Sequence, residues 1–423
     1  MLILLGTIIS FFLVVLLIRK NYNFGLSLIV GSLLLSLFSL NKVSFMEIGK
    51  AISKATIYSF QEETWVTQTI ELAVLMTLIY VLAKVMQKTG AINKLTNSLR
   101  IYLKKGGTIA VIPAIYGLLP VPGGALFSAP FVKEEGDKYR IDKDKKNFFN
   151  VWFRHLWFPI YPISSNIIII THLAGISIVS LIIADMPSFI AMIAIGLILL
   201  TFFIKKENDF SKKTEDKETF NHQGFIYFLP LVFPLFFWIL AYFGFTSEII
   251  AFTIGVIGSI IILFYLSDVK KEEYVELMKK SFTWNFIAVV FGIMIFREIF
   301  ETSGASLAIF DILKNIAVSP VLVIILLSFI LGFLTGYLLT GITLSYVLVE
   351  PLFVNAGIGI IGLTSLIFMS AFVGYLISPI HLCNVLSSDY LDTDTTRMYK
   401  VFIPSSIVIL LIQIVFIYMF FSI

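Results

Sequence analysis

Charged residues are scarce in this sequence. Of its 423 residues only 14% are Asp, Glu, Lys or Arg, whereas 58% are hydrophobic. Soluble domains carry about 25% charged and about 45–50% apolar residues. The scarcity of charge therefore excludes an ordinary soluble domain and predicts an all-α integral membrane protein that crosses the bilayer many times.

Cysteine and nucleotide-binding motifs are lacking as well. The single cysteine, Cys383, excludes a disulfide framework, and no CxxC pair is present. The histidines lie too far apart in the sequence for a paired metal motif, so we expect no metal site; they are His155, His172, His222 and His381. The absence of GxxxxGK[ST] argues against energy from bound ATP. Because HExxH and GxSxG are also absent, and no Asp lies within the predicted spans, we expect no enzyme.

Apolar runs long enough to cross a bilayer predict about ten transmembrane helices. The simple spans are expected at 1–18, 24–40, 65–86, 187–204, 225–243, 249–266, 282–300 and 401–423. The first run has no basic residues before it, which favours a span over a cleaved signal peptide. Two mixed segments that contain lysine, 46–60 and 268–281, are expected to lie on the membrane surface.

The stretch 107–132 is apolar and uncharged, with Pro120-Val121-Pro122-Gly123-Gly124 at its centre. Six Lys/Arg occur in 84–105 and seven in 133–154. Lys/Arg-rich loops mark the cytoplasmic side. The 26 residues between these flanks are too few for two spans, and prolines and glycines break a helix. The pattern predicts a re-entrant hairpin that enters and leaves on the cytoplasmic side.

A second hairpin and two broken helices are predicted further along the chain. The second hairpin, 320–353, is interrupted between Thr335 and Thr343, although its length also leaves room for two short spans. The broken helices are expected at 151–182, around Pro159 to Asn166, and at 360–385, around Ser378 to Asn384. Polar side chains at such breaks satisfy the freed backbone groups inside a membrane.

The two halves of the chain follow the same plan. A first repeat, 1–204, is joined by a polar cytoplasmic linker, 205–223, to a second repeat, 224–423. Each repeat is expected to have five crossings and one hairpin. Because five is odd, the second repeat must enter the membrane from the opposite side, which makes an inverted repeat with both termini outside. This plan is typical of secondary transporters.

Two short motifs carry a family resemblance: the run Pro120–Pro130 and Ser378–Cys383. They resemble a prokaryotic integral membrane family catalogued as domain of unknown function 401, within the ion-transporter superfamily of citrate, gluconate and dicarboxylate carriers. The resemblance implies a cation-coupled carrier, mostly of organic anions, with two facing hairpins. Dimers are common in that superfamily, so it also implies a homodimer. The Ser-Asn-Thr sequence frequent at hairpin tips of its carboxylate carriers is absent here.

The candidate binding residues lie at the predicted breaks. A broken helix exposes free N–H groups at one stub, which suit an anion, and free carbonyls at the other, which suit Na⁺. We expect Arg154 to be a topology anchor at the inner mouth, Cys383 to be a packing residue, and Glu71 and His381 to be candidates for coupling. The candidate substrate- and ion-binding residues are Pro122, Gly123, Gly124, Ser164, Ser165, Asn166, Thr340, Gly341, Thr343, Ser378, His381 and Asn384.

These patterns predict a secondary active transporter in a prokaryotic cell membrane. It would move a small anionic, carboxylate-type metabolite, coupled to Na⁺ or H⁺ by alternating access. An uncoupled permease or channel is the alternative, and it would need a continuous polar stripe that the sequence does not show. Beyond Na⁺ as a candidate coupling ion no cofactor is expected. The expected partners are the lipid bilayer and the substrate, not nucleic acid.

Overall fold

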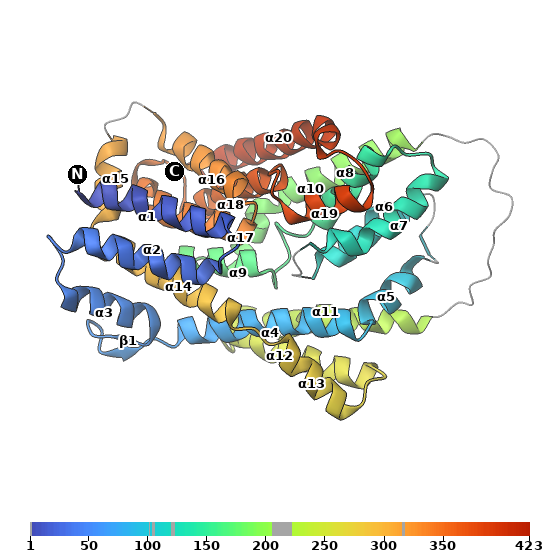
Figure 1. Ribbon diagram of the computed structural model, residues 1–423, viewed down its shortest axis with the longest axis horizontal. Helices are drawn as coiled ribbons and strands as arrows, with labels where there is room; N and C mark the ends of the chain where they lie inside the picture. Colours follow the sequence, from blue (N-terminus) through green and yellow to red (C-terminus); the bar gives the residue numbers. More distant parts are fainter. Residues whose placement is uncertain (1, 101, 104–105, 120–122, 205–221, 315–317) are drawn as a thin grey trace.

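The computed structural model describes residues 2–100, 102–103, 106–119, 123–204, 222–314 and 318–423 (Figure 1). Eight helical segments of this part of the chain are long and apolar enough to cross a membrane. Within it the only strands are β1 (Tyr58–Ser59) and β2 (Thr64–Trp65), which pair antiparallel. The protein is therefore a multi-pass helical membrane protein.

In the part of the chain that the structure describes, ten α-helices precede the linker and ten follow it. The first ten are α1 (Leu2–Arg19), α2 (Phe24–Ser39), α3 (Phe45–Thr56), α4 (Gln68–Lys88), α5 (Ala91–Arg100), α6 (Gly107–Gly117), α7 (Ala125–Lys138), α8 (Lys143–Arg154), α9 (Ser165–Ala174) and α10 (Ile178–Phe203). The others, with two 3₁₀ helices, are η1 (His222–Phe228), α11 (Leu229–Tyr242), α12 (Glu248–Leu266), α13 (Lys271–Ser281), α14 (Trp284–Thr302), α15 (Ala305–Lys314), α16 (Pro320–Thr335), α17 (Leu338–Val349), η2 (Glu350–Asn355), α18 (Ile360–Leu376), α19 (Leu382–Tyr390) and α20 (Thr395–Phe420).

Helix αn of the first set corresponds to helix αn+10 of the second, in order and in contacts. The last helices of the two sets, α10 and α20, each have 26 residues, and α5 and α15 each have 10 residues. Contacts between the sets occur in exchanged pairs: α2 packs on α14 as α12 packs on α4, α7 on α19 as α17 on α9, and α8 on α20 as α18 on α10. The two halves thus pack against each other in an equivalent way.

The helices of the two predicted hairpins are short. Helix α6 has 11 residues and α7 has 14, whereas α16 has 16 and α17 has 12. At 1.5 Å per residue they measure about 16 to 24 Å, less than the roughly 30 Å hydrocarbon core. Within each pair the two helices pack against each other. In the second pair Gly332 and Gly341 let the two backbones approach closely, since a Cβ on Gly341 would lie 2.9 Å from the Gly332 Cα.

The boundaries around the first broken helix differ from those expected at 151–182. Helix α8 begins earlier, at Lys143, and ends at Arg154; α9 occupies 165–174, and α10 begins at Ile178. The expectation that no Asp lies within a span is wrong, because α10 runs without interruption through Asp185 and Pro187. A proline removes one backbone hydrogen bond from a helix. Such a proline is tolerated in a membrane because groups on neighbouring helices can satisfy the freed carbonyl.

Helices α8 and α18 form the centre of the molecule. Every residue from Lys146 to Arg154 in α8 and from Gly362 to Leu376 in α18 is buried. By contrast, α10 and α20 expose large apolar side chains such as Ile198 and Val415, as expected of helices that face lipid. In Figure 1 the short helices α5 and α15, which follow the corresponding helices α4 and α14, lie at opposite ends of the long axis.

Candidate functional site

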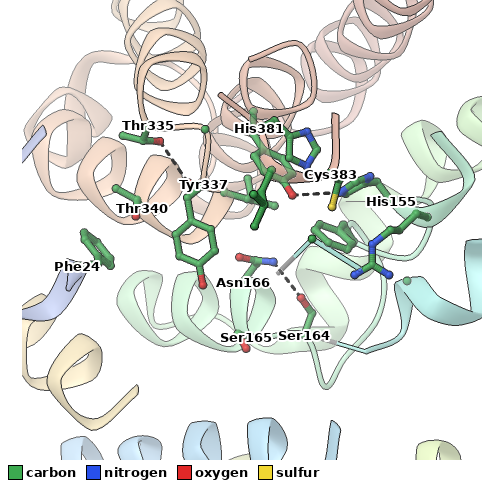
Figure 2. A pocket seen from close by; sticks show the side chains of 18 of the residues that line it. Phe24, His155, Ser164, Ser165, Asn166, Thr335, Tyr337, Thr340, His381 and Cys383 are labelled. Atoms are coloured by element: carbon green, nitrogen blue, oxygen red, sulfur yellow. Dashed lines mark hydrogen bonds between the residues drawn. The ribbon is translucent and has the colours of Figure 1, made fainter. Parts of the chain in front are cut away.

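A cavity of about 430 Å³ lies where helices are interrupted in both halves (Figure 2). Four helices end beside it, namely α6, α8, α16 and α18, and four begin beside it, namely α7, α9, α17 and α19. The breaks between them supply most of the lining: 117–119 with Gly123, 154–166, 335–340 and 375–383. The ends of α6 and α16, the starts of α7 and α17, and the breaks that follow α8 and α18 therefore converge on one space.

The four helix starts at this cavity are not capped by side chains. Elsewhere in the described chain some helix starts are capped, as by Asn23, Ser177 and Ser247 at α2, α10 and α12, and others are not, as at α16 and α18. At α7, α9, α17 and α19 the side chain of the residue before the helix makes no capping hydrogen bond. The first backbone N–H groups of a helix need a partner, and they carry the positive end of the helix dipole. Four such ends around one cavity favour an anion.

Arg154 adds a full positive charge to the cavity lining. Only 2% of this residue is exposed, and its guanidinium donates a hydrogen bond to the Tyr116 carbonyl at the end of α6. Gly117 and Gly124 make room for it, because a Cβ at either position would overlap Arg154 atoms. The expected topology anchor at the inner mouth is instead a buried cation at the end of α8, in contact with the end of α6 and with Gly124 before α7.

Six of the residues predicted from the sequence line the cavity. Asn166 donates to the Ser164 hydroxyl over 3.3 Å at the start of α9 (Figure 2). The Thr340 hydroxyl is buried without a hydrogen-bond partner among the described residues. The six are Gly123, Ser164, Ser165, Asn166, Thr340 and His381.

Five other predicted residues that the structure describes do not line the cavity. Thr343 donates to the Leu339 carbonyl in the preceding turn, and Ser378 donates to the Phe333 carbonyl. Asn384 donates to the carbonyls of Leu376 and Ser378, so it satisfies the second break. Their contacts are those of structural residues. Two glycines pack against neighbours, Gly124 against Arg154 and Gly341 against Gly332, and Pro122 lies outside the described residues.

His155, His381 and Cys383 form a cluster at one side of the cavity (Figure 2). Their ligand atoms all lie within 4.8 Å of one another, and all three residues are buried. The His155 Nδ1 atom lies 2.7 Å from the Val151 carbonyl, and its Nε2 atom lies 3.1 Å from the Tyr375 hydroxyl. The sequence did not suggest this grouping, because His155 and the other two residues are in different halves of the chain.

Two acidic residues lie away from this cavity. Glu71, the candidate for coupling, is in the first turn of α4 and does not line it. Asp185 is fully buried on α10, where its Oδ1 accepts a 2.6 Å hydrogen bond from Ser365. Gln413 on α20 donates to the Ser365 hydroxyl over 2.6 Å and accepts from Ser188 over 2.5 Å. This second polar network joins α10, α18 and α20.

Comparison with known proteins gives one family. The family described as "Protein of unknown function (DUF401)" matches residues 1–419, so the chain belongs to that family. No curated protein matches the sequence.

Proposed function

We propose that this member of the DUF401 family is a secondary active transporter of a small anion, coupled to Na⁺ or H⁺. The observation that carries the proposal is the meeting of four uncapped helix starts and the Arg154 guanidinium at one cavity. Intramembrane charge is costly and marks functional sites by default. A small carboxylate is the substrate class that best matches these donors.

The lining favours a compact, polar substrate. A volume of about 430 Å³ is toward the small end of the usual range for ligand pockets. Arginine presents donors in a planar fork that matches a carboxylate. Asn166 and the hydroxyls of Ser164 and Thr340 add neutral hydrogen-bonding groups. The Tyr161, Tyr337 and Phe158 rings supply apolar walls.

The arrangement of the two halves supports alternating access. The exchanged helix contacts and the placement of α5 and α15 at opposite ends support an inverted repeat. The short, mutually packed helices α6–α7 and α16–α17 support hairpins that enter from opposite sides and end at the cavity. Inverted repeats with broken helices near the midplane are the usual design of carriers that rock around a fixed site.

A coupling cation would bind at the C-terminal ends of helices beside the cavity. Helices α6, α8, α16 and α18 end at the cavity, and a helix C-terminus carries free carbonyls and the negative end of the dipole. Some of these carbonyls already have donors, as Tyr116 has from Arg154 and Leu376 has from Asn384. The remaining ones supply oxygen ligands of the type that Na⁺ uses.

The proposal is tested by uptake into proteoliposomes. Labelled citrate, succinate, gluconate and lactate are offered with an inward Na⁺ gradient, with a proton gradient, and with neither. We expect one of these anions to accumulate only with a gradient. We expect Arg154→Gln to lower uptake at least tenfold, and Arg397→Gln, which removes an exposed arginine of α20, to leave it unchanged. Uptake that ignores both gradients would favour the uncoupled permease or channel, and wild-type uptake by Arg154→Gln would overturn the assignment of the anion site.

A further inference from the structure

We propose that His155, His381 and Cys383 bind a soft transition-metal ion of the Zn²⁺ class. Two imidazoles and a thiol, with ligand atoms within 4.8 Å of one another, form the cluster. Nitrogen and sulfur ligands of this kind are those that Zn²⁺ prefers, and three protein ligands leave a fourth position open to the cavity. This inference does not rest on the proposed transport function.

The contacts of His155 prepare it as a ligand. Its Nδ1 atom lies 2.7 Å from the Val151 carbonyl, which can only accept, so Nδ1 carries the proton. The lone pair is therefore on Nε2, on the side of the cluster. A ligating histidine usually donates its other N–H to a carbonyl or carboxylate in this way. The Tyr375 hydroxyl, 3.1 Å from Nε2, occupies that lone pair when no metal is bound.

His381 provides the strongest indication of a missing ligand. It is 1% exposed, and neither ring nitrogen has a nitrogen or oxygen hydrogen-bond partner among the described residues. Leaving a buried polar group unsatisfied is unfavourable. Its ring lies 4.8 Å from that of His155 and 4.0 Å from that of Tyr375, so it faces the cluster. A metal ion at the centre of the cluster would satisfy it.

Metal binding requires only a small closure. Bond lengths of about 2.0–2.1 Å to nitrogen and about 2.3 Å to sulfur bring tetrahedral ligands to roughly 3.5 Å from one another. The ligand atoms would therefore have to approach by about 1 Å. Arg154, which also lines the cavity, opposes the binding of a cation there.

The site would join the two halves of the molecule. His155 follows α8 of the first half, whereas His381 and Cys383 begin α19 of the second. A metal ion bound to all three would hold these two broken helices together beside the cavity. We therefore expect Zn²⁺ to stabilise one conformation and to inhibit any movement that separates them.

Cobalt titration of the purified full-length protein in detergent tests the site. Co²⁺ replaces Zn²⁺ at such sites, and its bond to a thiolate absorbs in the near ultraviolet. Because Cys383 is the only cysteine, that band can arise from one residue alone. We expect the wild type to show the band, Zn²⁺ to displace it, and Cys383→Ser to lack it. His155→Ala and His381→Ala should weaken Co²⁺ binding at least tenfold, and His172→Ala, outside the cluster, should not.

The outcomes separate the metal site from the transport function. A folded wild type, as judged by its thermal unfolding, that shows no thiolate band at millimolar Co²⁺ would overturn the metal site. A band that keeps its strength in both His155→Ala and His381→Ala would overturn it as well. If Co²⁺ binds as expected but no anion is taken up, only the proposed function fails. If uptake is coupled but no metal binds, only the metal site fails.

Discussion

The two broken helices end at the same cavity but bring different chemistry to it. In the first half α8 ends in Arg154, and the residues 155–164 separate it from α9. In the second half α18 ends in Leu376, and only 377–381 precede α19. The positive charge thus comes from the first half, whereas two of the three metal-type ligands come from the second. The two halves therefore arrange their helices in an equivalent way but place different side chains at the helix breaks.

Two glycines, Gly124 and Gly332, also differ in what they make room for. Gly124 in the first half makes room for the end of a flexible side chain, the Arg154 guanidinium. Gly332 in the second half makes room for backbone, because a Cβ there would overlap the Ala371 carbonyl of α18. A guanidinium can shift, and a helix backbone can shift only together with its neighbours. The first hairpin also has a backbone contact of this kind, because a Cβ on Gly117 would overlap the Arg154 carbonyl, so we infer that Gly124 is the more adjustable position rather than the first hairpin as a whole.

The largest expected effect concerns the orientation of the halves. In a Cys383→Ser background, we predict that Lys143→Cys, after the first hairpin, and Ser319→Cys, before the second, react from opposite faces of the membrane. A membrane-impermeant maleimide applied to intact cells should label Ser319→Cys and should reach Lys143→Cys only after permeabilisation. Asn97→Cys on α5 is the control that should behave like Lys143→Cys. Labelling of both hairpin positions from one face would contradict the inverted repeat.

Gly332 should be more sensitive to added volume than Gly124. Gly332→Val must force α16 away from α18, and overpacking of this kind costs about 1–3 kcal/mol or more. Gly124→Val only needs the Arg154 side chain to move, so it should lower the thermal unfolding temperature less while reducing anion uptake more. Thermal unfolding and uptake of both variants provide the measurement. Equal destabilisation by the two would remove the distinction between the two positions.

The helices could be predicted well from the sequence because their signals are local. An apolar run of fixed length between polar flanks predicts where a span begins and ends, and 249–266 was expected where α12 covers 248–266. Prolines and glycines also indicated the helix breaks beside which Ser164, Asn166 and His381 lie. Each of these inferences needed only neighbouring residues.

The features that the sequence did not predict depend on how deeply a residue is buried and on partners far away in the chain. Arg154 is the last residue of a Lys-rich stretch, and this position predicts an anchor at the membrane surface. Helix α8 begins at Lys143, however, so Arg154 lies about 17 Å further along the helix. Asp185 lies between the expected segments 151–182 and 187–204, and its partner Ser365 lies on another helix. The metal-type cluster joins His155 to residues more than 200 positions away, and no local spacing reveals such a group.

A smaller effect separates the buried network of Asp185 from the cavity. Asp185→Asn keeps an oxygen that can accept the hydrogen bond from Ser365, whereas Asp185→Ala leaves that hydroxyl unpaired and opens a void. We predict that Ala costs about 2–3 kcal/mol in the free energy of unfolding and that Asn costs about 1 kcal/mol or less. Thermal unfolding compares the two. Equal losses would mean that the carboxyl group itself, rather than its hydrogen bond, is required.

The smallest expected effect lies at the surface, where Lys94 of α5 pairs with Asp268 of the second half over 2.7 Å. The hydrogen bond from Lys94 lowers the pKa of the Asp268 carboxyl. A carboxyl whose pKa is lower in the folded state stabilises the fold above its unfolded value of about 3.9, and this contribution is lost as the pH falls through the folded value.

Asp268→Asn should therefore lower the thermal unfolding temperature slightly at pH 7 and in low salt. The difference from wild type should shrink in high salt, and it should disappear at a pH below the folded pKa of Asp268. Glu298→Gln breaks the 2.8 Å ion pair between Lys54 and Glu298, which is less exposed than the pair of Lys94 and Asp268. This substitution should therefore have the larger effect at pH 7. If Asp268→Asn were the more destabilising substitution, the exposed ion pair would contribute more to stability than the less exposed one. That result would contradict the small contribution expected of surface ion pairs.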